Sequence, residues 1–170
     1  MTNSSVIQQT ENVARILNPD WIEDGVLMHE AFMLNVGESY ISVNRPVIDS
    51  YADDVADFIK KHPDYAFGEN SYKRALLHVS DICAIDVSLE GISAKINVEV
   101  EPRDSHTKSH AGIFTRINNL NIKRGQTLKV VPQSDGVSAD TILLEVRMAL
   151  LDLSKVETCS NEKQSQVTSC

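Results

Sequence analysis

The stretch LEGISAKINVEVEP, residues 89–102, decides the fold class of this chain. From residue 92 to residue 100, apolar side chains alternate with polar ones without interruption. A period of two over this length is typical of a β-strand with one buried face and one face in water. The preceding LEG is a turn signal, because Gly91 can adopt backbone angles that other residues avoid. We therefore expect an antiparallel hairpin formed with residues of about 75–88.

Two segments with helical periodicity precede and follow this hairpin. In PVIDSYADDVADFIKKH, residues 46–62, apolar residues recur at steps of three and four. Its aspartates lie early and its basic residues late, which suits the helix dipole, and we interpret the aspartates as a solvated face. In residues 138–155 the apolar stripe is broader, so this helix should pack on more than one side or contact a partner. The two main helices are predicted at about 47–62 and 138–155.

The order of these segments predicts an α+β fold, in which the two main helices pack on a mostly antiparallel sheet. ESYISVNRP contains strand formers at Tyr40, Ile41 and Val43 and is bounded by glycine and proline, so it should form another strand. A further short strand is expected at residues 128–131. A short helix is expected from Thr10, because the apolar residues that follow it have helical spacing.

The composition is that of a soluble globular protein. With 170 residues, 42% of them hydrophobic and 24% charged, the chain can bury one sizeable core. We expect a single domain over residues 11–156, between a frayed N-terminus (1–10) and a disordered polar tail (157–170). Apolar runs are far shorter than the roughly 20 residues of a membrane helix. No basic start followed by an apolar core indicates secretion, and three cysteines make no disulfide framework, so a cytoplasmic location is expected.

The charge balance bears on the class of partner. A formal net charge of −8 argues against nucleic acid, because binding to phosphate relies on Lys and Arg that displace counterions. The basic residues of NIKRGQTLK, residues 121–129, are interpreted as solvated strand ends. Neither a phosphate-binding loop nor a dinucleotide fingerprint occurs, and we expect no cofactor.

The stretch RDSHTKSHAGIF, residues 103–114, contains the residues that look most like chemistry. His106 and His110 are four residues apart, a spacing that can bind zinc when it falls on a helix. The glutamate that follows the first histidine of a zincin helix is missing, and turn formers surround His106, so we predict no metal site. His110 stands where a polar loop meets the apolar AGIF. It is interpreted either as a hydrogen-bonded structural residue or as a general acid–base.

Arg45 follows the strand predicted in ESYISVNRP. Its guanidinium can hold a carboxylate or phosphate in a bidentate fork, or it can pair with one of the many acidic residues of the chain. The sequence leaves both alternatives open.

The segments GESYISVNR and SHAGIF together resemble a pattern in small uncharacterised bacterial proteins. In that pattern a Glu-x-x-hydrophobic-Ser-Val strand precedes a His-Ala-Gly-Ile segment. The resemblance covers these two short motifs only and carries no established activity. It implies that six residues approach one another in space: Glu38, Ser42, Asn44, Arg45, His110 and Gly112.

Two functions of different classes are therefore considered. The first is a non-enzymatic accessory protein that contacts a partner protein, one encoded nearby, with self-association through the last helix as a variant. The candidate partner-binding residues are Leu143, Leu144, Met148 and Leu151. The second is a small hydrolase or transferase in which His110 moves a proton, Arg45 holds an anionic substrate and Glu38 assists. The absence of a complete catalytic motif favours the first.

Overall fold

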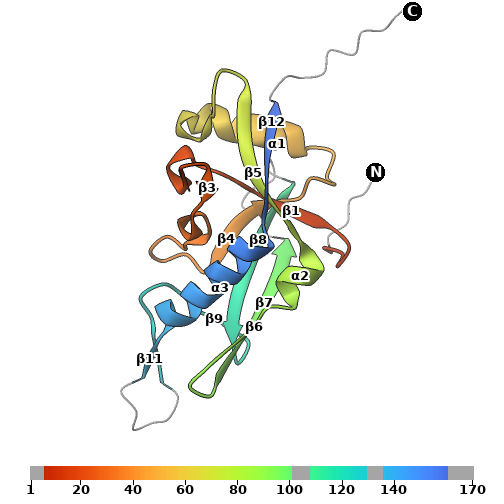
Figure 1. The fold of residues 1–170 in the computed structure, drawn as a ribbon. Helices are drawn as coiled ribbons and strands as arrows, with labels where there is room; N and C mark the ends of the chain where they lie inside the picture. The colour runs from red at the N-terminus through yellow and green to blue at the C-terminus, as the bar shows by residue number, and fades with distance from the viewer. Residues whose placement is uncertain (1–5, 101–107, 130–135, 161–170) are drawn as a thin grey trace, which may run out of the picture.

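The computed structural model of the chain describes residues 6–100, 108–129 and 136–160. Its centre is an eight-stranded sheet in the order β12-β5-β1-β4-β8-β7-β6, with β9 paired to β8 (Figure 1). All pairings described in it are antiparallel, which confirms the α+β prediction. In chain order its strands are β1 (Asn12–Ile16), β4 (Tyr40–Asn44), β5 (Ser71–His78), β6 (Asp86–Leu89), β7 (Ile92–Val100), β8 (His110–Ile117), β9 (Leu120–Asn121) and β12 (Lys155–Ser160).

The predicted hairpin around LEG is present, but its first strand is short. β6 and β7 turn through Glu90 and Gly91, both with positive φ, so that Leu89 faces Ile92. Residues 71–78 form β5, on the other half of the sheet, and α2 (Val79–Cys83) separates β5 from β6. The alternation in β7 indicates a strand with one wet face, but it does not indicate how long its partner is.

The helix predicted from Thr10 is wrong, because this segment forms β1, between β5 and β4. Both Val13 and Ala14 are buried although they point to opposite faces of the sheet. A strand covered on both faces lacks the alternation that identifies a half-buried strand, and its apolar residues can imitate helical spacing.

The two main helices are present and pack on opposite faces of the sheet. α1 (Tyr51–Lys61) packs its apolar residues with the face of the sheet that carries Ala14, Ile16 and Tyr72. α3 (Ala139–Leu153) packs on the other face, over the larger core, and Figure 1 shows it crossing the sheet diagonally. α1 begins at Tyr51, later than predicted, because the chain after Arg45 first makes hydrogen-bonded turns.

The chain ends of the predicted domain are more ordered than expected over the residues described. Gln9 and Glu11 accept hydrogen bonds through their carbonyls from the backbone N–H groups of Ser80 and Val79, which fixes the segment from residue 6 onward. Residues 157–160 of the predicted tail belong to β12, an edge strand on β5. Arg74 donates to the Glu157 carboxylate across this pair and holds the pKa of Glu157 below its ordinary value. Residues 1–5 and 161–170 lie outside the described residues.

The remaining elements are short. Among the described residues, no helix combines the length and the apolar character needed to cross a membrane. The strand expected at 128–131 is seen as β10, and residues 130–131 lie outside the described part. The short strands pair as β2 (Ile22–Glu23) with β3 (Val26–Leu27) and as β10 (Thr127–Leu128) with β11 (Val137–Ser138). The 3₁₀ helices are Pro19–Trp21, His29–Phe32 and Pro63–Tyr65.

Candidate functional site

The pairing of β4 with β8 brings together most of the residues that the two sequence motifs contain. Asn44 faces His110 and Ser42 faces Gly112 in this antiparallel register. The backbone N–H of Arg45 donates to the carbonyl of Ser109 at 2.8 Å, which continues the ladder by one residue.

Glu38 stands apart from this group. It precedes β4, at the end where Tyr40 faces Phe114, and its carboxylate accepts a hydrogen bond from the backbone N–H of Asn35. The six residues between Glu38 and Asn44 span about 20 Å in an extended strand. The structure therefore places Glu38 at the opposite end of β4 from Arg45 and His110.

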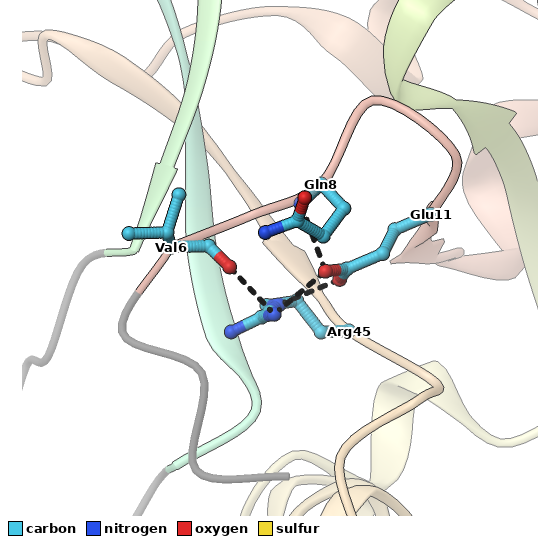
Figure 2. Close-up of polar contacts among 4 residues, drawn as sticks. All are labelled: Val6, Gln8, Glu11 and Arg45. Carbon is cyan, nitrogen blue, oxygen red and sulfur yellow. Dashed lines mark hydrogen bonds and ion pairs between the residues drawn. The ribbon is translucent and has the colours of Figure 1, made fainter.

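Arg45 is engaged by the N-terminal segment (Figure 2). Its Nε donates to one Glu11 carboxylate oxygen at 3.0 Å and its Nη2 to the other at 2.9 Å. The carbonyl of Val6 accepts from the same Nη2 at 3.5 Å, and the Arg45 residue is only 1% exposed. Of the two interpretations of Arg45, the geometry supports the internal ion pair, because Glu11 occupies the bidentate fork.

A buried polar network surrounds the start of β8. The Asp54 carboxylate accepts hydrogen bonds from the backbone N–H of Ser109 and from the hydroxyl of Ser50, both at 3.0 Å. Asn44 donates through its side-chain amide to the Ser109 hydroxyl at 3.1 Å. Asp54 is thus buried, whereas the sequence suggested a solvated aspartate. The network ties the first turn of α1 to the ends of β4 and β8.

His110 lies within this environment as a buried residue, 9% exposed, and its ring meets that of Tyr40 edge to face. The segment from His110 onward is a strand, not the helix that a zinc-binding pair four residues apart requires. His106 lies outside the described residues. Over the part of the chain that the structure describes, no group of three or more His, Cys, Asp or Glu side chains is placed to hold a metal ion.

The candidate partner-binding residues of α3 divide between two sides of the helix. Leu143 is buried in the core, because successive residues of a helix point about 100° apart. Leu144 and Met148 are exposed by 37% and 41%, and Leu151 is half-buried. Leu143 is therefore a packing residue, whereas the other three form one side of α3.

A pocket of about 140 Å³ lies between α3 and the starts of β4 and the end of β8. Its apolar wall comes from Phe32, Leu34, Ile41, Ile113, Leu143 and Val146. Two guanidinium groups, those of Arg124 and Arg147, also line it, together with Ser39, Thr115 and Asp140. Sequence reasoning missed this pocket, because its residues come from segments far apart in the chain and none of them forms a local motif.

Comparisons with models of known protein families, with curated proteins and with solved structures gave no match for this chain. The likeness of the two short motifs to small bacterial proteins thus has no family match beside it. The functional argument rests on the residues and their geometry.

Gly112 allows the close contact between β8 and the ring of Tyr40. A Cβ atom at this position would lie 2.7 Å from Cδ2 of Tyr40 and 2.9 Å from Cε2 of Phe114. Gly112→Ala should therefore lower the free energy of unfolding by about 1–3 kcal/mol, as overpacking does in other cores. Urea denaturation measures this change.

The control for Gly112→Ala is Ser93→Ala on β7, an exposed position at which stability should change by less than about 0.5 kcal/mol. Glycine in a strand is itself unfavourable by about 0.5–1 kcal/mol. An alanine variant as stable as the wild type, or more stable, would show that the Tyr40 ring moves aside without loss.

Proposed function

We propose that this protein is a non-enzymatic cytoplasmic interaction protein that binds a partner protein through the outer side of α3. The observation that carries the proposal is the α3 strip, formed by Leu144, Met148 and Leu151. These residues lie within about 60° of one another around the helix axis. Two of them are more than one-third exposed. The strip is opposite the side of α3 that packs on the sheet, so core packing does not account for it.

The surroundings of the α3 strip indicate the chemistry of the partner. Two exposed carboxylates, Glu145 and Asp152, lie along one border of the strip, about 80–100° from Leu144 around the helix. An apolar groove with basic residues along one rim would complement this surface. A second copy of this chain would bring the same acidic border and a net charge of −8, so we infer a different protein as partner.

The enzymatic alternative has less support in the geometry. Glu11 already fills the fork of Arg45, and Glu38 lies at the far end of β4. His110 is buried, and neither it nor Arg45 lines the pocket beneath α3. An interaction protein therefore accounts for more of the observed features than a hydrolase or transferase does.

The test uses a photo-crosslinking amino acid at position 148 in cells, followed by purification of the captured protein. We expect a heterologous protein that binds the wild type when both are pure, and at least tenfold weaker binding to Leu144→Lys/Met148→Lys. Loss of exposed apolar contacts at an interface centre has effects of this size. Isothermal titration calorimetry measures both affinities.

Leu153→Lys is the matched control for the α3 strip. Leu153 is 40% exposed, close to the values for Leu144 and Met148, but it points to the other side of α3. Its lysine variant should bind the partner as the wild type does. Equal binding by the double lysine variant, or crosslinks only between copies of this chain, would contradict the proposal.

A further inference from the structure

The pocket beneath α3 combines an apolar wall with two guanidinium groups. Arg124 comes from the loop after β9 and Arg147 from the middle of α3, so the two meet only in the folded chain. The apolar residues of the wall belong to β4, β8, α3 and the 3₁₀ helix His29–Phe32 with the residues after it. The pocket is thus built from regular elements that hold its shape.

The hydrogen bonds of these arginines are incomplete within the described residues. The Nε of Arg147 is buried and has no hydrogen-bond partner there. Arg124 makes one long contact, from Nη1 to the carbonyl of Leu34 at 3.4 Å. A guanidinium carries five N–H donors, and a buried donor left unpaired is unfavourable by about 1–3 kcal/mol. An acceptor in the pocket would remove that penalty.

The pocket carries a net positive charge of one. Asp140 is the carboxylate among its lining residues, and one of its oxygens accepts the backbone N–H of Gly125 at 2.7 Å. Two guanidinium groups against one carboxylate suit a monoanion better than a phosphate with two negative charges. A carboxylate also matches the planar fork of arginine.

We propose that this pocket binds a small organic monocarboxylate with an aryl or branched-alkyl body. The carboxylate accepts hydrogen bonds from Arg147 and Arg124, and the hydrocarbon part packs on the apolar wall. The pocket volume of about 140 Å³ is close to that of cavities that hold one benzene-sized molecule. This inference is independent of the α3 strip, which lies on the opposite side of the helix.

The test compares benzoate with benzamide, which has the same shape and no charge. Titration is followed by ¹⁵N–¹H NMR of the full chain at low salt. We expect benzoate to shift the amide signals of Leu34, Thr115 and Val146, and to bind at least tenfold more tightly than benzamide. Equal affinities would overturn the proposal, since they would show a purely apolar cavity. Tighter binding of inorganic phosphate than of benzoate would also overturn it.

Two variants separate the role of the guanidinium from folding. Arg147→Met keeps an apolar stem of similar length and should weaken benzoate binding at least tenfold, whereas Lys60→Met, on exposed α1 surface, should leave it unchanged. Ser39→Leu keeps both arginines but fills the pocket, and it should abolish binding without lowering the melting temperature. Undiminished benzoate binding by either Arg147→Met or Ser39→Leu would place the ligand elsewhere and overturn the inference.

Discussion

Replacement of Arg45 by methionine is expected to lower the free energy of unfolding by about 3–5 kcal/mol, because it leaves the Glu11 carboxylate buried without its partner. The Glu11 side chain is only 10% exposed and receives two hydrogen bonds from the Arg45 guanidinium. For a domain of this size, a loss of this magnitude lowers the melting temperature by roughly 10 °C. Urea denaturation and differential scanning calorimetry measure the two quantities.

The pair Arg116–Glu99 is the matched control for Arg45–Glu11. It is also a bidentate ion pair, but it lies on the exposed part of the sheet, with side chains that are 23% and 43% exposed. Arg116→Met should therefore cost less than about 1 kcal/mol. If Arg45→Met were no more destabilising than Arg116→Met, the segment around Glu11 would be free to swing into water, and its role as a fixed clasp on β4 would be refuted.

Replacement of Leu150 by alanine should destabilise the protein by about 2–5 kcal/mol, because it removes a fully buried side chain and leaves a cavity under α3. Leu150 has no exposed surface and belongs to the main core. Met148→Ala, two residues earlier on the outer side, should change stability by less than about 0.5 kcal/mol. Both free energies of unfolding are obtained from chemical denaturation.

This comparison tests how α3 is oriented on the sheet. A Met148→Ala variant that loses as much stability as Leu150→Ala would mean that Met148 is covered within the folded chain. In that case the α3 strip could not serve as the contact surface for a partner. A small effect at Met148 and a large one at Leu150 would support the orientation seen here.

The elements that sequence reasoning predicted well are those with one buried face. The alternation in β7 and the three- and four-residue steps in α1 and α3 each report a boundary between core and water. β1 was predicted as a helix because helices cover both faces of the sheet at this strand and remove that boundary. β12 was missed because an edge strand of mostly polar residues resembles a solvated tail.

The candidate sites could be predicted only in part, since their partners are distant in the chain. The bidentate potential of Arg45 was recognised, but Glu11 lies 34 residues away and nothing local marks it as the partner. The burial of Asp54 depends on Ser109, 55 residues later. The arginines of the pocket have no sequence signal at all, because their meeting depends on how α3 crosses the sheet.

The sequence by itself determined the α+β class, the two main helices and the strand with one wet face. Periodicity is local information, and it records how a segment divides its side chains between core and water. Only the tertiary structure decided the strand order, the clasp on Arg45 and the pocket beneath α3. These features depend on contacts between distant segments, whose identity follows from how all elements pack together and not from any one of them.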